Sequence, residues 1–156
     1  AVMLISSCGG SEDPIKLFEN GEYDAAFKLF SQQAASGDVQ ASNYLGMHYY
    51  LALGVARDFN RAAALFEIAA LAELPNAQRN LGIMYLRGLG MEKDFHQAYG
   101  WFFAAHAGGN IGSKEYLDLM VDNVTPNASG IARKNIRQKI AAHAAASLLP
   151  EPTSAH

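Results

Sequence analysis

The chain has 156 residues, half of them apolar and 17% charged, with a net charge of −3. This length suits one ordinary domain, the apolar fraction excludes a disordered chain, and the single cysteine excludes a disulfide framework. No apolar run reaches the roughly 18 residues of a membrane-spanning helix, and the charge argues against a general nucleic-acid-binding protein. The charge is uneven: residues 1–122 carry 8 basic and 14 acidic side chains, whereas residues 123–156 carry 4 and 1.

The first feature along the chain is the stretch Met3-Leu4-Ile5-Ser6-Ser7-Cys8, in which apolar and then small residues precede the cysteine. It is similar to the end of a bacterial lipoprotein signal, so Cys8 is a candidate lipidation site. Residues 1–12 are then a signal remnant or a tether, and we expect a lipid-anchored protein of the cell envelope that faces the periplasm. The alternative is an unmodified cysteine in a frayed terminus of a cytoplasmic protein.

Helical periodicity dominates the rest of the chain, and no alternating strand pattern occurs. Apolar residues recur every three or four positions and share one helix face, as Ile136, Ile140, Ala144 and Leu148 do in the last segment. The pattern predicts helices near 13–19, 23–36, 38–52, 58–72, 75–87, 94–107, 111–122 and 126–147. The tail 149–156 is predicted to fray, and the fold class is all-α.

An ungapped internal repeat of 36 residues relates residues 41–73 to residues 77–109. The identical positions are Ala41/Ala77, Leu45/Leu81, Gly46/Gly82, Tyr49/Tyr85, Leu53/Leu89, Gly54/Gly90, Asp58/Asp94, Phe59/Phe95, Ala62/Ala98, Phe66/Phe102 and Ala69/Ala105. A period of this size is typical of helix-pair solenoids. The sequence therefore predicts an α-α superhelix of about three and a half helix-turn-helix repeats.

Several residues have predicted roles within each repeat. Asp58 and Asp94 are expected to cap the N-terminus of the second helix, and Gln97 would complete a capping box with Asp94. Gly46 and Gly82 lie inside helices, where glycine costs about 1 kcal/mol relative to alanine. We expect the backbone of the partner helix to pack against them, which the small residues Ala62 and Ala98 of that helix would permit.

These units resemble the Sel1-like repeat family, relatives of tetratricopeptide repeats. The resemblance rests on Ala77, Leu81-Gly82, Tyr85, Gly88-Leu89-Gly90, Asp94, Ala98, Trp101, Ala105 and Gly109, and on the matching residues of the unit before it. It implies a repeat domain over 13–148, with a half-repeat at 15–37, repeats at 38–73 and 74–109, and a degenerate capping repeat at 110–148. Ala52 and Glu73 stand where the family has glycines, so the first of these turns is expected to be reshaped, and Leu65 replaces a tryptophan.

The resemblance implies a non-enzymatic adaptor or scaffold that binds a protein or peptide partner on a concave face. By analogy with helix-pair repeats, exposed positions of each first helix form that face. They are Gln40, Asn43, Met47 and Tyr50 in one repeat and Asn76, Arg79, Ile83 and Arg87 in the next. Self-association into a structural assembly is the main alternative, and an unrecognised enzyme is a weaker one.

No motif for catalysis, a metal or a cofactor stands out. The five histidines lack metal-ligand spacing, and Gly88-Leu89-Gly90 has no preceding strand, so we expect no catalytic, metal or cofactor site. Trp101 is expected in the core rather than on a platform that stacks nucleic-acid bases.

The last helix carries four basic residues: Arg133, Lys134, Arg137 and Lys139. They predict a solvated face, with an acidic partner or anionic lipid as alternatives.

Overall fold

The computed structural model describes residues 12–148, and within that span every regular element is a helix. The all-α prediction is confirmed, and each predicted helix is present with bounds that differ by at most two residues. The α-helices are α1 (Pro14–Glu19), α2 (Tyr23–Ala35), α3 (Val39–Leu51), α4 (Phe59–Leu71), α5 (Pro75–Arg87), α6 (Phe95–Ala107), α7 (Ser113–Met120) and α8 (Pro126–Ser147), with a 3-10 turn, η1 (Val121–Asn123), before α8.

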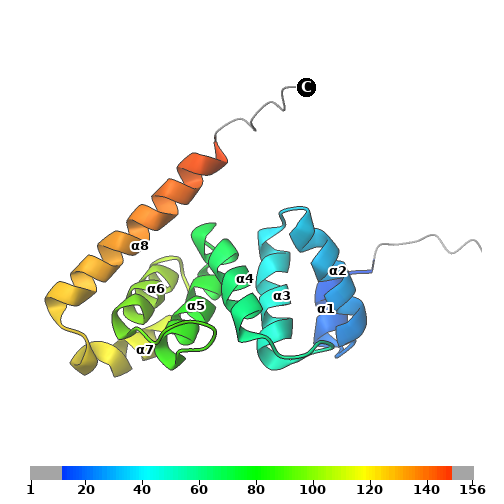
Figure 1. Cartoon of the computed structure of the whole chain (residues 1–156), viewed down its shortest axis with the longest axis horizontal. Helices are drawn as coiled ribbons and strands as arrows, with labels where there is room; N and C mark the ends of the chain where they lie inside the picture. The colour runs from blue at the N-terminus through cyan, green and yellow to red at the C-terminus, as the bar shows by residue number, and fades with distance from the viewer. Residues whose placement is uncertain (1–11, 149–156) are drawn as a thin grey trace, which may run out of the picture.

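Consecutive helices pack on one another from α1 to α7, which gives the predicted solenoid (Figure 1). The pairs α3–α4 and α5–α6 are the helix hairpins of the two complete repeats. We call α3, α5 and α7 the A helices and α2, α4 and α6 the B helices. The predicted caps are present, because Asp58 accepts from the Arg61 amide at 3.0 Å and Asp94 accepts from the Gln97 amide at 3.0 Å.

The capping box predicted at α6 is only half formed. The Gln97 side chain does not return a hydrogen bond, since its buried oxygen has no partner among the described residues. The Asp94 carboxylate instead accepts a second backbone amide, that of His96, at 2.8 Å. The prediction of a reciprocal capping box was therefore wrong, although the cap itself is present.

The helical glycines contact aromatic rings of the partner helix rather than the predicted helix backbone at Ala62 and Ala98. A Cβ atom on Gly46 would lie 2.7 Å from the Phe66 ring, and one on Gly82 would lie 2.8 Å from the Phe102 ring. In each complete repeat a phenylalanine ring of the B helix therefore lies against a glycine of the A helix. Sequence spacing placed the partner helix correctly and the contacting residue wrongly.

The turn at Ala52 is not reshaped, contrary to expectation. Ala52 adopts a left-handed conformation with φ of 59°, close to the 67° of Gly88 in the next repeat. The backbone bond from Leu53 to His48 also matches that from Leu89 to Met84. Glu73 is a second left-handed residue that occupies a glycine position, with φ of 61°. Both side chains are therefore accommodated at the expense of backbone strain.

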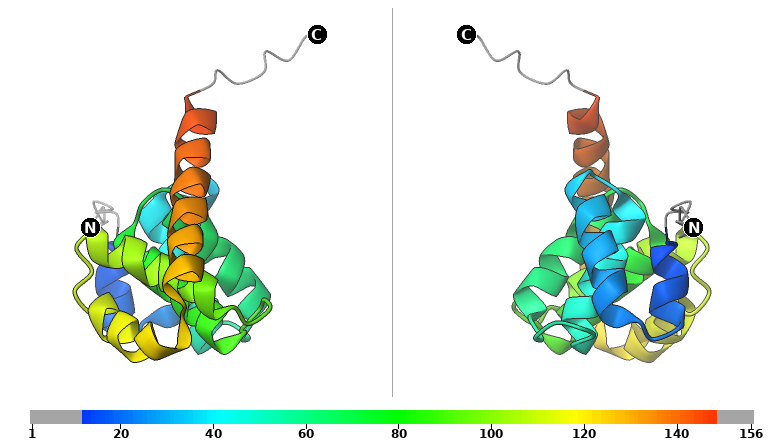
Figure 2. Two further views of the ribbon diagram at one scale, coloured as in Figure 1. Left: turned by 90° about the vertical axis from the view of Figure 1, so that its left-hand side faces the viewer. Right: turned by 90° about the vertical axis from the view of Figure 1, so that its right-hand side faces the viewer.

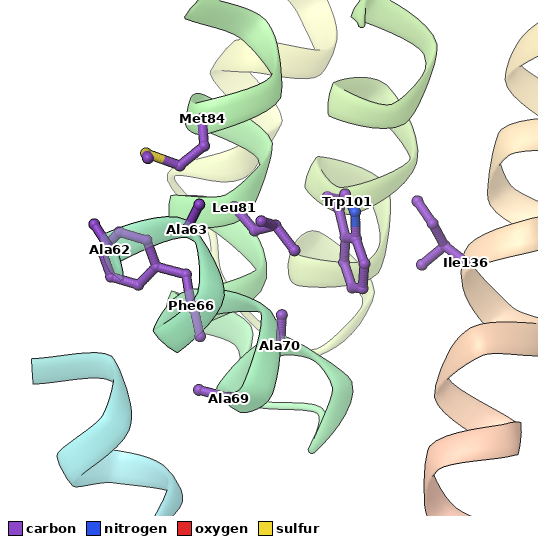
Figure 3. Packing of buried hydrophobic residues seen from close by; sticks show 10 residues of the cluster. Ala62, Ala63, Phe66, Ala69, Ala70, Leu81, Met84, Trp101 and Ile136 are labelled. Atoms are coloured by element: carbon purple, nitrogen blue, oxygen red, sulfur yellow. The ribbon is translucent and has the colours of Figure 1, made fainter. Parts of the chain in front are cut away.

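The core is a chain of hydrophobic clusters that continues from repeat to repeat. The largest contains alanines of α4 and α5 together with Phe66, Leu81 and Met84. Trp101 is completely buried in the same cluster, as predicted, and Figure 3 shows it between Leu81 of α5 and Ile136 of α8. Its indole nitrogen has no hydrogen-bond partner among the described residues. The core thus ties the last long helix to the repeats.

Helix α8 turns back across α6 and reaches the edge of α4. The close approach is made at Gly100, where a Cβ atom would lie 2.5 Å from Ile136 and 3.3 Å from the Ala132 backbone. The C-terminal half of α8 extends away from the body (Figures 1 and 2). Ala144 and Leu148, predicted to continue the apolar face, are exposed, Leu148 by 84%. That part of the prediction was wrong, because α8 is longer than the surface of α6 and α4 on which it packs.

Candidate interaction surface

The A helices are joined side by side through paired side chains that lie 37 residues apart. The Asn80 amide donates to the Asn43 oxygen at 3.0 Å, and the Arg87 guanidinium donates to the Tyr50 hydroxyl at 3.4 Å. The Arg79 guanidinium lies 5.2 Å from the ring centroid of Tyr116 in α7. A side chain of one A helix therefore contacts the next A helix about one repeat later.

The candidate residues of α3 differ in exposure. Gln40 is exposed, whereas Met47 and Tyr50 are half-buried and pack against the largest core cluster. Asn43 is only 5% exposed, so its predicted place on the open surface was wrong. Its amide faces α5 and is occupied by the hydrogen bond with Asn80.

The candidate residues of α5 lie one repeat further along the same layer. Asn76 and Arg87 are exposed, and Arg79 is half-buried over Tyr116. Ile83 is half-buried and packs into the cluster around Phe102. The structure thus brings the predicted residues together as one layer, and leaves Gln40, Asn76 and Arg87 the most accessible of them.

Two polar contacts of Asn110 join α5 to the start of α7. The Asn110 amide donates to the Asn76 oxygen at 2.8 Å, which ties α5 to the turn before α7. The Asn110 oxygen in turn accepts from the Ser113 amide at 3.0 Å, at the start of α7. The bridging side chains of the layer are therefore already hydrogen-bonded to one another.

Buried titratable groups lie between the helices. His48 is fully buried; its Nδ1 lies 2.6 Å from the Leu53 carbonyl oxygen, and its Nε2 has no partner among the described residues. Burial lowers the pKa of His48, and the hydrogen bond to Leu53 opposes that shift. Burial also raises the pKa of Tyr85, helped by the nearby carboxylates of Glu67 and Asp94. Both groups are therefore neutral at pH 7.

Residues 12–148 contain no cluster of three or more metal-ligating side chains, and none of their helices is long and apolar enough to cross a membrane. Cys8 lies outside the described residues. The structure therefore adds no metal site to the candidate surface and leaves the lipidation site a prediction.

A groove of about 450 Å³ lies between α8, α6, the turn from α4 to α5 and the start of α5. Its lining residues include the apolar Phe103, Ile136 and Ile140 and the charged Arg133, Arg137 and Glu73. The two arginines stood out in the sequence as cations of the last helix. The groove itself was missed, because the sequence does not show that α8 folds back on α6.

The chain has recognisable relatives. A family model described as Sel1 repeat matches residues 39–73 and 75–110. A search of curated proteins gives no match.

Two solved structures share the fold. One is c5321, described as a protective antigen present in uropathogenic Escherichia coli strains displaying an SLR fold, with a TM-score of 0.75, 27% identity, and coverage of 92% of this chain and 32% of that one. The other is a Sel1 repeat protein from Oxalobacter formigenes, with a TM-score of 0.61, 20% identity, and coverage of 70% and 48%. The chain thus spans about a third of the first structure and about half of the second. The chain thus contains two consecutive Sel1 repeats and shares the helix-pair solenoid fold of these structures.

Proposed function

We propose that the protein is an adaptor that binds a protein or peptide partner on the layer formed by its A helices. The observation that carries this proposal is the continuity of that layer, in which paired side chains join α3 to α5 and α5 to α7. Sel1 repeats are typically protein-interaction modules. The proposal includes no catalytic step, because the fold is typically a non-enzymatic scaffold.

Site-specific crosslinking tests the proposal. A photoreactive amino acid is placed at Gln40, Asn76 or Arg87, which are exposed on the layer, and the crosslinked products are identified from the native cells. The matched control carries the same group at Lys28, which is exposed on α2, a B helix. We expect one partner to be captured from all three layer positions and not from Lys28. Equal capture from all four positions, or capture from Lys28 alone, would place the interaction elsewhere.

We also propose that Cys8 anchors the protein to a bacterial membrane, so that the repeats face the periplasm. The supporting feature is the order of residues before the cysteine, which is apolar and then small, and the short Gly9-Gly10-Ser11 segment behind it. Mass spectrometry of the protein from its native cells tests this. A lipid mass on Cys8 supports the anchor, and an unmodified thiol together with a cytoplasmic fraction rejects it.

Self-assembly is a second candidate, favoured by the exposed apolar side chains at the α7 end of the solenoid. Leu119 is 76% exposed and Val121 is 62% exposed, at the end where a further repeat would stack. Light scattering of the full chain over a range of concentrations tests this. Growth in mass that Leu119→Glu abolishes would support assembly, and a constant monomer mass would reject it.

A further inference from the structure

We propose that the groove beside α8 is a second binding site, separate from the A-helix layer, that takes a peptide segment carrying a carboxylate next to an apolar side chain. Its volume of about 450 Å³ lies in the range typical of ligand pockets. None of the eight residues predicted for the interaction surface lines this groove. The proposal therefore does not rest on the adaptor function proposed above.

The carboxylate is assigned by Arg133. Its guanidinium lies 4.7 Å from the ring centroid of Phe103, and its Nε donates to the Ser129 carbonyl oxygen at 3.4 Å. The contact with the ring and the hydrogen bond of Nε hold the guanidinium in the groove lining, and its two terminal nitrogens are the donors that bind a carboxylate in a bidentate manner. These nitrogens have no hydrogen-bond partner among residues 12–148.

Arg137 extends the same wall. It follows Arg133 by one helical turn and therefore lies on the same face of α8. Neither arginine forms an ion pair in the described part of the chain, where the lysine and arginine ion pairs are Arg61–Asp58 and Lys114–Asp118. Helix α8 contains no acidic residue that could neutralise them from within the helix. Two unpaired cations along one wall favour an anionic ligand.

The apolar side chain of the ligand is assigned by the other lining residues. Phe103 and Ala104 of α6, together with Ile136 and Ile140 of α8, also line the groove. Glu73, in the turn between α4 and α5, also lines the groove and disfavours a carboxylate near that turn. The ligand would thus place its carboxylate toward α8 and its apolar side chain between α6 and α8.

A pair of capped dipeptides tests this assignment. Acetyl-Glu-Leu-amide and acetyl-Gln-Leu-amide differ only in the charged group, and each is titrated into the ¹⁵N-labelled full chain while NMR spectra are recorded. We expect saturable shifts of the Arg133 side-chain Nε–H and of the Gly100 and Ala104 amides. Binding of the Glu peptide should be about tenfold tighter than that of the Gln peptide, because one charge-assisted pair distinguishes them.

Variants that remove one charge should change the affinity for the Glu peptide in opposite directions, which an apolar patch would not do. Arg137→Gln, at an exposed position, and Arg133→Gln should each lower the affinity for the Glu peptide several-fold and leave the affinity for the Gln peptide unchanged. Glu73→Gln should raise the affinity for the Glu peptide, because it removes a negative charge that repels the carboxylate of the peptide. Lys134→Gln is the matched control, because Lys134 lies on α8 but does not line the groove. Equal affinity for the two peptides, shifts confined to Gln40, Asn76 and Arg87, or no saturable shift would overturn the proposal.

Discussion

The side-chain nitrogen of Asn80 in α5 donates a hydrogen bond of 3.0 Å to the side-chain oxygen of Asn43 in α3. One period of 36 residues later, Arg79 takes the position of Asn43 and Tyr116 takes the position of Asn80. There the guanidinium of Arg79 in α5 lies 5.2 Å from the ring centroid of Tyr116 in α7. The same place in two successive repeat interfaces is thus bridged by different chemistry, an amide pair in one and a cation–π pair in the other. What the fold requires there is a side chain that reaches the next A helix.

Asn43→Ala should destabilise the protein by about 1–3 kcal/mol, because Asn43 is buried and the half-buried amide of Asn80 loses its acceptor. Urea unfolding of Asn43→Ala, Asn80→Ala and the double variant measures the coupling between the two residues. We expect the double variant to be less destabilised than the sum of the singles. Gln40→Ala, on the exposed side of the same helix, is the control and should stay within about 0.5 kcal/mol. Strict additivity of the two asparagine variants would contradict the bond.

Ala52→Gly should raise stability slightly, by up to about 1 kcal/mol. Ala52 sits at φ of 59°, where an L-residue carries strain that glycine does not. The gain is offset in part by the greater freedom of glycine in the unfolded chain. Ala64→Gly gives the opposite sign, a loss of about 1 kcal/mol, because Ala64 is an exposed residue in the middle of α4. If both variants lose stability equally in thermal unfolding, Ala52 is not strained.

Gly82→Ala should destabilise the protein by about 1–3 kcal/mol, although alanine is the better helix former. The new methyl group would lie 2.8 Å from the Phe102 ring, which is completely buried and stacked on Tyr116. Combining Gly82→Ala with Phe102→Leu should cost less than the sum of the two single changes, since the smaller side chain makes room. Calorimetry of the three variants measures this coupling.

Gly130→Ala is the matched control for Gly82→Ala. Gly130 lies inside α8, and a Cβ atom there would meet nothing within 4 Å. The same substitution should therefore raise stability by about 0.5–1 kcal/mol at this position. A loss at both glycines would mean that the ring of Phe102 is not the cause.

Much of the fold follows from the sequence because its signals are local. The spacing of apolar residues, the capping aspartates Asp58 and Asp94, and the repeat of Phe66 at Phe102 each act within one helix hairpin. Repetition then fixes the stacking, because each hairpin meets a neighbour with the same surface. The helix bounds and the solenoid class could therefore be predicted without tertiary information.

The features that escaped prediction depend on contacts between distant segments. The burial of Asn43 depends on Asn80, which lies in another hairpin. The return of α8 to α6 depends on Gly100 facing Ile136, and no periodicity in either helix shows that pairing. The groove exists only because of this return, so its arginines could be noticed in the sequence but not placed around a cavity.

His48 should make the protein less stable as the pH falls below about 6.5, the ordinary pKa of histidine in an unfolded chain. Burial lowers the pKa of His48 in the folded protein. Between the pKa of the folded protein and that of the unfolded chain, the unfolded chain therefore binds a proton at this residue and the folded protein does not. The contribution of neutral His48 to the free energy of unfolding is therefore fully present above its pKa in the unfolded chain. It is lost as the pH falls toward its pKa in the folded protein, by up to about 1.4 kcal/mol per pH unit. Urea unfolding at pH 7.5 and pH 5.5 measures the loss.

His48→Met isolates this contribution, because Met84 fills the equivalent position of the next repeat and is also completely buried. The variant gives up the contact between Nδ1 and the Leu53 carbonyl oxygen, but it also removes the buried Nε2 that has no partner. We expect it to fold and to lose most of the difference in stability between pH 7.5 and pH 5.5. Met84→Leu, a non-titrating change at the matched site, should shift stability at both pH values equally. An unchanged pH dependence in His48→Met would mean that other groups control the acid sensitivity of the fold.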